Sequence, residues 1–161
     1  MPDRKGEIAK MKTKTFITSL LLTLVLVGST FSHAVAKEIH STDALYPAVG
    51  PYSQMVQAGN MLFLSGVIPL NREGNAIQGE TIEEQTRLVL DYIGAKLESQ
   101  GLGFEDVVMS NVFMADLNDF GTMNRVYAEY FHTDPPARAT VEVARLPRDV
   151  LIEIAVVAYK P

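Results

Sequence analysis

The apolar positions of this chain follow two spacings, helical periodicity and alternation, and each predicts a different kind of element. The clearest helical pattern begins after Thr81, whose hydroxyl can accept from the Glu84 amide while Glu84 reaches back to the same turn. Gly101 is expected to end this helix. Its apolar stripe consists of Ile82, Thr86, Val89, Leu90, Ile93 and Leu97.

A second helix is expected to start at Asp116 or Asn118 and to reach about Phe131, because Pro135 and Pro136 cannot continue it. Its apolar stripe consists of Phe120, Met123, Val126, Tyr127 and Tyr130.

Alternating segments predict the strands. Residues 55–58 and 61–65 flank Gly59-Asn60, a two-residue turn signal, and therefore predict a hairpin. Segment 107–115 is apolar enough for a strand buried on both faces. Residues 37–50 predict a short strand followed by a loop, and residues 71–79 predict a polar loop.

The C-terminal part predicts a second hairpin, because two alternating runs flank a connection that contains Pro147 and Asp149. Collecting the apolar residues of both runs on one face would place Thr140 opposite Glu153. Arg138 would then be a diagonal neighbour of Glu153, and both side chains would face the same space. That space is the candidate site.

The order strand, hairpin, helix, strand, helix, hairpin predicts an α+β domain, a mixed sheet with both helices packed on one face. The other face, expected to carry Arg138, Thr140 and Glu153, is too apolar overall to remain in water. We therefore expect it to be an interface.

Residues 1–36 have the pattern of a signal peptide: basic residues at Lys12 and Lys14, an apolar stretch at 16–31, and the small-residue cleavage site Ala34-Val35-Ala36. Met11 is an alternative start. We expect cleavage after Ala36, a domain at 37–161 and a periplasmic or secreted protein without membrane contact, with an uncleaved anchor as the alternative. The chain has no cysteine, which excludes a lipid-modified cysteine and a disulfide framework.

Charge and composition exclude several classes of function. Residues 37–161 carry 9 basic and 17 acidic side chains, a net charge of −8, so nucleic acid is not an expected partner. His40 and His132 lack partners at metal-ligand spacing, and no metal site is expected. No Ser-His-Asp order, phosphate-binding loop or dinucleotide fingerprint is present, and no cofactor is expected.

Several motifs resemble one known family in order and spacing. They are Gly50-Pro51-Tyr52-Ser53-Gln54, Gly59-Asn60, Ser65-Gly66, Ile68-Pro69, the segment 113–120, Pro136-Ala137-Arg138, Arg145-Leu146-Pro147-Arg148-Asp149 and Ile152-Glu153-Ile154. Over residues 38–159 the chain resembles the reactive-intermediate deaminases (RidA, YjgF-type). The resemblance implies a chorismate-mutase-like fold and a homotrimer whose sheets form a central β-barrel, with ligand clefts between subunits.

The resemblance also implies site roles. Arg138 would hold a substrate carboxylate, and Glu153 would position or deprotonate water, with Tyr52 as a third catalytic residue. Matching residues that line the cleft are Ser65, Gly66, Asn124 and Thr140. Taken alone, Arg138 and Glu153 could equally form a structural ion pair.

Two positions depart from the family pattern. Thr140 stands where many members have cysteine, and Val67 stands where glutamine is frequent. Either change could alter the range of substrates.

The activity implied is hydrolysis of small 2-imino or enamine acids, such as 2-iminobutanoate and 2-iminopropanoate, to 2-oxo acids and ammonia. Two alternatives remain open: a non-catalytic trimer that binds small carboxylates or acts as a stress or chaperone-like protein, and an endoribonuclease. The net charge of −8 on residues 37–161 disfavours the endoribonuclease.

Overall fold

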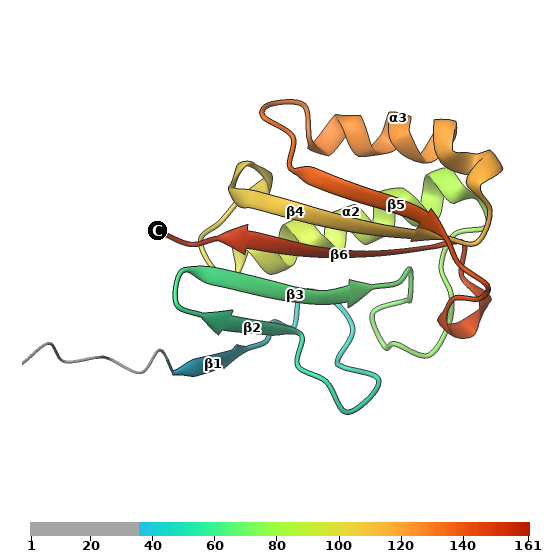
Figure 1. Cartoon of the computed structure of the whole chain (residues 1–161). Coiled ribbons are helices and arrows are strands. Elements are labelled where there is room, and N and C mark those ends of the chain that lie inside the picture. Colours follow the sequence, from blue (N-terminus) through green and yellow to red (C-terminus); the bar gives the residue numbers. More distant parts are fainter. Residues whose placement is uncertain (1–35) are drawn as a thin grey trace, which may run out of the picture. The chain divides into compact units, whose positions relative to one another are not determined.

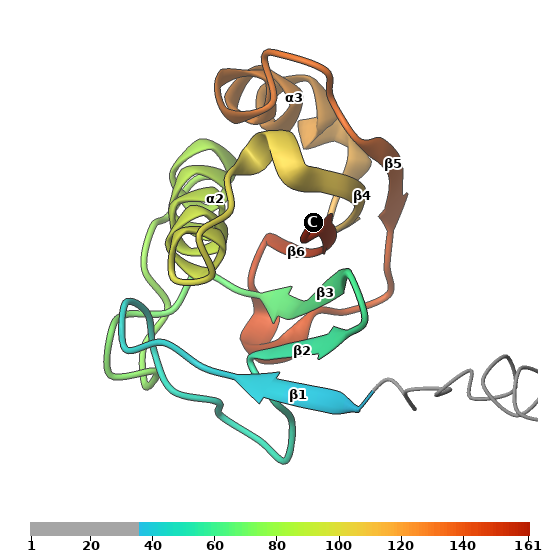
Figure 2. The same cartoon turned by 90° about the vertical axis from the view of Figure 1, so that its left-hand side faces the viewer.

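A mixed sheet carries both helices on one face in the computed structural model, which describes residues 36–161 (Figures 1 and 2). Its six strands lie in the order β1-β2-β3-β6-β4-β5. Only the β4–β5 pair is parallel; the other neighbours are antiparallel. The strands are β1 (Lys37–His40), β2 (Met55–Ala58), β3 (Met61–Val67), β4 (Val107–Met114), β5 (Ala137–Glu142) and β6 (Ile152–Tyr159).

The helices begin and end where local sequence signals place them. Helix α2 (Ile82–Glu98) starts at the capping box, in which the Glu84 amide donates to the Thr81 hydroxyl at 3.2 Å and the Thr81 amide donates to the Glu84 carboxylate at 3.1 Å. Helix α3 (Phe120–Tyr130) follows a short 3-10 turn, Leu117–Asp119, capped by Asp116. Both helix predictions are confirmed.

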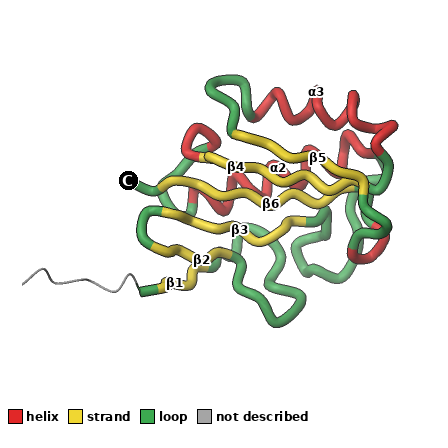
Figure 3. The backbone as a smooth tube through the Cα atoms, in the orientation of Figure 1, coloured by secondary structure: helices red, strands yellow, loops and turns green. Residues whose placement is uncertain are grey.

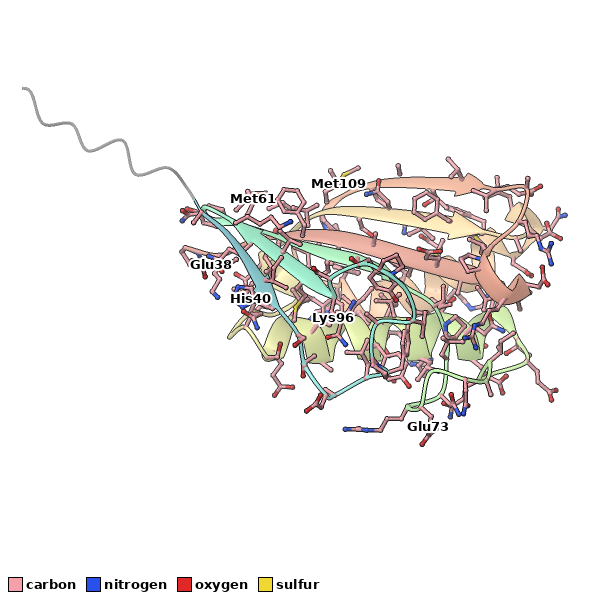
Figure 4. The ribbon with its side chains drawn as sticks, turned by 90° about the horizontal axis from the view of Figure 1, so that it is seen from below. Glu38, His40, Met61, Glu73, Lys96 and Met109 are labelled. Atoms are coloured by element: carbon pink, nitrogen blue, oxygen red, sulfur yellow. The ribbon has the colours of Figure 1, made fainter. Side chains whose placement is uncertain are left out.

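The two faces of the sheet differ in cover. The face toward α2 and α3 holds the buried core, for example Leu64, Val112 and Ile154. The opposite face, called the open face below, leaves Phe63 and Tyr159 exposed. In Figure 4 the labelled Met61 and Met109 lie on the open face, and Lys96 lies on the side of the helices.

The predicted C-terminal hairpin is wrong. Strands β5 and β6 are not neighbours, because β4 lies between them and pairs with both (Figure 1). Strand β4, α3 and β5 instead form a βαβ unit, in which a helix connects two parallel strands. The physical reason is that α3 supplies the crossover connection that a parallel pair of strands requires. The prediction that this strand is buried on both faces is also wrong, because Ser110 and Val112 on one face are buried whereas Val108 is exposed and the other residues of the open face are only partly buried.

The connection between β5 and β6 is a loop with one short helical turn, Pro147–Asp149 (Figure 3). Arg148 and Asp149 have φ values of 59° and 61°, a left-handed conformation that non-glycine residues rarely adopt. The Arg145 guanidinium donates two hydrogen bonds to the Asp149 carboxylate, at 2.6 and 2.9 Å.

This topology separates the two residues that the hairpin would have joined. Ser110 is opposite both Arg138 in β5 and Val156 in β6, so Arg138 faces the helices. Phe113 is opposite both Val141 and Glu153, so Glu153 lies on the open face. Arg138 and Glu153 therefore point to opposite sides of the sheet, and the predicted diagonal contact does not exist.

Candidate functional site

A cavity of about 290 Å³ opens beside Glu153 and is called the acid pocket below. Its walls are partly apolar and partly polar. They are formed by Val49, Tyr52, Ser65, Gly66, Ile68, Pro147 and Glu153.

A bulge in β3 shapes the floor of the acid pocket. The register between β3 and β6 shifts between Leu64 and Val67, so Ser65 and Gly66 occupy the irregular stretch. The Ser65 hydroxyl donates to the Ser53 carbonyl at 2.6 Å and its amide donates to the Gln54 carbonyl at 3.1 Å. These two bonds fix the bulge against the preceding loop.

Glycine at position 66 leaves room for the Glu153 carboxylate, which lies directly against it. A methyl group on Gly66 would overlap that carboxylate. Close approach of a side chain to the backbone is a standard reason for glycine inside a strand.

Burial raises the pKa of Glu153 above its ordinary value of 4.5. Within residues 36–161 no cationic side chain lies at ion-pair distance from this carboxylate. Glu153 can therefore hold a proton closer to neutral pH than an ordinary carboxyl group, which suits a general acid or base.

Two tyrosines support the pocket. Tyr52 lines it, and its hydroxyl accepts from the Val49 amide at 3.3 Å. Tyr46 is buried beneath, and its hydroxyl accepts from the Ile68 amide at 3.0 Å. Sequence analysis missed Tyr46, because an isolated aromatic residue in a loop carries no signal of such a role.

A second group of residues, called the arginine cluster below, lies between β5 and α3. The Arg138 guanidinium donates to the Asn124 side-chain oxygen at 2.8 Å. Its central carbon lies 4.5 Å from the centre of the Tyr127 ring and 5.7 Å from that of Phe120. The Thr140 hydroxyl is buried on the same face of β5.

The structure thus divides the predicted site residues into two groups. Tyr52, Ser65, Gly66 and Glu153 meet in the acid pocket, whereas Arg138, Asn124 and Thr140 meet in the arginine cluster. Phe120 and Tyr127 were expected only as apolar helix positions. Both face Arg138, and helical periodicity alone could not show this.

The alternative of a structural ion pair between Arg138 and Glu153 is not supported, since the two lie on opposite faces of the sheet within one chain. In the described part of the chain, no group of three or more histidine, aspartate or glutamate side chains could hold a metal ion. No helix among these residues is long and apolar enough to cross a membrane.

The mixed sheet backed by two helices carries Glu153 against Gly66 on its open face and Arg138 against aromatic rings on the other face. A family model described as endoribonuclease L-PSP matches residues 41–160. The chain therefore belongs to the endoribonuclease L-PSP family, the RidA/YjgF type of protein. The resemblance and the α+β fold inferred from sequence are confirmed.

Individual relatives show the same similarity. A RutC family protein of Saccharolobus solfataricus is 52% identical over 124 residues, which cover 77% of this chain and 98% of that protein. The chloroplastic Reactive Intermediate Deaminase A of Arabidopsis thaliana is 42% identical over 130 residues, covering 81% of this chain and 70% of that protein.

Solved structures agree in fold. The YjgF gene product of E. coli is 41% identical, with a TM-score of 0.72, and the match covers 77% of this chain and 99% of the E. coli chain. E. coli TdcF, solved with bound serine, is 38% identical with a TM-score of 0.72 and the same coverage.

The comparisons contradict one prediction, that of a signal peptide and a periplasmic location. The RutC family protein of Saccharolobus solfataricus is matched over 98% of its length by 124 residues of this chain. Its similarity therefore concerns the α+β domain and gives no support to export. The prediction rested on residues 1–36, of which residues 1–35 lie outside the described residues.

Proposed function

We propose that this protein hydrolyses small 2-imino acids, the tautomers of enamine acids, to 2-oxo acids and ammonia. The observation that carries the proposal is the presence of two preset groups in the chain: a carboxyl group with a raised pKa in a small pocket, and an arginine held by an amide and two aromatic rings. The relative named Reactive Intermediate Deaminase A supports the same class of activity.

Each group supplies one part of the chemistry. Arg138 would bind the substrate carboxylate through two parallel hydrogen bonds, a geometry that the guanidinium fork favours. Glu153 would take a proton from water while the water oxygen forms a bond to the carbon of the protonated imine and the C=N π electron pair moves to nitrogen. It would then return that proton to nitrogen; the C–N bond breaks, ammonia leaves, and the new hydroxyl closes to a carbonyl as its proton passes to solvent.

Positioning accounts for most of the expected rate enhancement. A protonated imine is already electrophilic, and holding it beside a bound water replaces a bimolecular encounter with an oriented one. No cofactor takes part in this scheme.

We propose further that the two groups meet between subunits of a homotrimer. Within one chain they lie on opposite faces of the sheet, so a neighbouring chain must supply one of them. The open face supports this assembly, because Phe63, Val141 and Tyr159 are 46%, 45% and 47% exposed in the single chain. The serine in TdcF is a ligand of the size and charge that this arrangement would accept.

The primary experiment is a coupled assay in which 2-iminobutanoate or 2-iminopropanoate is generated in situ. The protein should hasten the hydrolysis of both. Arg138→Ala should weaken binding of the product mimic 2-oxobutanoate in calorimetry and abolish turnover, and Arg138→Lys should rescue little. Glu153→Gln should still bind the mimic while hydrolysis slows.

Mixed trimers test the shared site directly. Alone, subunits carrying Arg138→Ala should be inactive, and subunits carrying Glu153→Gln should hydrolyse the imine only slowly. Dissociated and reassembled together in equal amounts, they should regain about one quarter of the wild-type sites, because each site draws on two neighbours. Failure to regain activity, with trimers verified by light scattering, would refute the shared site.

A second function is suggested by the family description, endoribonuclease L-PSP. The net charge of −8 on residues 37–161 opposes binding of a phosphate backbone. Binding of 2-oxobutanoate without any imine turnover would instead favour the small-carboxylate-binding alternative.

A further inference from the structure

Arg138 rests on a stack of buried aromatic rings that extends into the core. The Tyr127 ring, 4% exposed, lies 4.5 Å from the guanidinium carbon and stacks on Phe131 with centroids 4.3 Å apart. Phe131 meets Phe104 edge-on at 4.9 Å. The Tyr127 ring is therefore buried among aromatic side chains and presents one face to the arginine.

We propose that Tyr127 is a positioning residue for Arg138: its ring fixes the plane of the guanidinium so that the edge not bonded to Asn124 is presented to the substrate carboxylate. This inference rests on the proposed function, since it assumes that Arg138 binds a carboxylate. It adds a residue that sequence analysis assigned only to the apolar stripe of a helix.

Three features of the contact support this role. An aromatic face attracts a guanidinium through its quadrupole, and the attraction strengthens when water is excluded, as it is around a buried ring. Asn124 lies one helical turn before Tyr127 on α3, so the amide and the ring approach Arg138 from the same side. Burial raises the pKa of Tyr127, so its ring remains a neutral phenol.

The ring rather than the hydroxyl is expected to carry the effect. The Tyr127 hydroxyl is buried near Ser110 and Arg138, but among the described residues no hydrogen bond of good geometry joins it to either. Tyr127→Phe should therefore keep the function, whereas Tyr127→Leu should lose it. This contrast separates the proposal from a role of the hydroxyl in proton transfer.

The chain offers a matched control for loss of core packing. Phe131, 6% exposed, stacks on Tyr127 but is not among the rings that face Arg138. Phe131→Leu removes a buried aromatic side chain next to the same ring, so both leucine variants should lower the melting temperature. Only Tyr127→Leu should affect the arginine.

The test measures binding, kinetics and the arginine itself. In Tyr127→Leu, the affinity for 2-oxobutanoate and 1/KM for the imine should fall roughly tenfold, with a smaller change in kcat. Tyr127→Phe and Phe131→Leu should bind within about twofold of wild type. In NMR spectra, the Arg138 side-chain signals should carry a ring-current shift in wild type and Tyr127→Phe that is greatly reduced in Tyr127→Leu, where only the more distant Phe120 ring remains.

Unchanged Arg138 signals or unchanged affinity in folded Tyr127→Leu would overturn the positioning role, as would an equal loss in Phe131→Leu. A wild-type protein that fails to bind 2-oxobutanoate would overturn the proposed function instead. The Arg138 signals are read without ligand, so the two failures are distinguishable.

Discussion

Replacing Lys96 with methionine should stabilise the domain, although it removes a charge and a hydrogen bond. Lys96 lies in the last turn of α2, is 2% exposed, and donates to the Ser65 carbonyl at 3.3 Å. Burial lowers the pKa of this lysine from its ordinary value of 10.5 to about 8. At pH 7 the buried side chain is still mainly protonated, although burial disfavours the charged ammonium group relative to the neutral amine.

The magnitude follows from the shift in pKa. A fall in the pKa of Lys96 from 10.5 to about 8 corresponds to a destabilisation of the folded protein by roughly 3 kcal/mol at a pH where Lys96 is protonated in both the folded and the unfolded state. Losing the bond to the Ser65 carbonyl offsets about 1 kcal/mol of the gain. Lys96→Met should thus raise the free energy of unfolding by roughly 2 kcal/mol at pH 7, and the melting temperature by roughly 8 °C.

The pH dependence provides the sharper test. Below pH 8 Lys96 is protonated in both states and the full destabilisation is present. As pH rises toward 10.5 the folded state loses the proton first, so the unfolded state binds more protons and wild-type stability increases. Lys96→Met should lack this increase.

Denaturant unfolding at pH 7 and pH 10, at one protein concentration, measures both effects. The range stops at pH 10 because burial raises the pKa values of Tyr46 and Tyr130 to about 12, and their titration would oppose the trend. Exposed Lys37→Met serves as a control and should change neither stability nor slope. A Lys96→Met protein that is less stable at pH 7, or that keeps the wild-type pH dependence, would refute the reasoning.

Three further predictions concern other parts of the domain. Thr81→Ala should lower the free energy of unfolding by about 1 kcal/mol through loss of the capping box, and Thr81→Ser should recover most of it in calorimetric melts. Gly66→Ala should displace the Glu153 carboxylate and lower kcat in the imine assay with little change in melting temperature; full activity would contradict the close contact. Glu153→Gln should melt higher than wild type at pH 8 but not at pH 4, because a raised folded-state pKa makes wild-type stability fall as pH rises through that pKa.

The sequence could specify the helices because their signals are local. The capping box at Thr81 and the apolar stripe behind it lie within a few turns of one another, and α2 starts at the predicted residue. The first hairpin follows from Gly59-Asn60 in the same way.

Strand neighbours could not be predicted with the same certainty. Alternation correctly places Arg138 and Thr140 on one face of β5, but it does not say which strand lies alongside. The connection around Pro147 resembles a hairpin loop in composition. Two successive left-handed residues, Arg148 and Asp149, allow it instead to lead the chain past β4, and arginine and aspartate give no clear signal of that conformation.

The family resemblance identified most residues of the candidate site, and the structure showed how these residues are arranged. The family resemblance selected Tyr52, Ser65, Gly66 and Asn124, none of which alternation or periodicity marks as functional. Their division between two faces of the sheet is a property of the topology, and only the structure could reveal it.

Burial disfavours the charged forms of both Glu153 and Lys96. The two residues differ in their surroundings, and this difference indicates which of them can take part in catalysis. Glu153 borders a cavity of about 290 Å³, so water and substrate can exchange protons with it. Lys96 is 2% exposed, donates to the Ser65 carbonyl and is not among the residues that line that cavity. A perturbed pKa therefore indicates function only where the titrating side chain borders an open cavity. By that criterion Glu153 is a candidate for catalysis, whereas Lys96 is a candidate for a stabilising replacement.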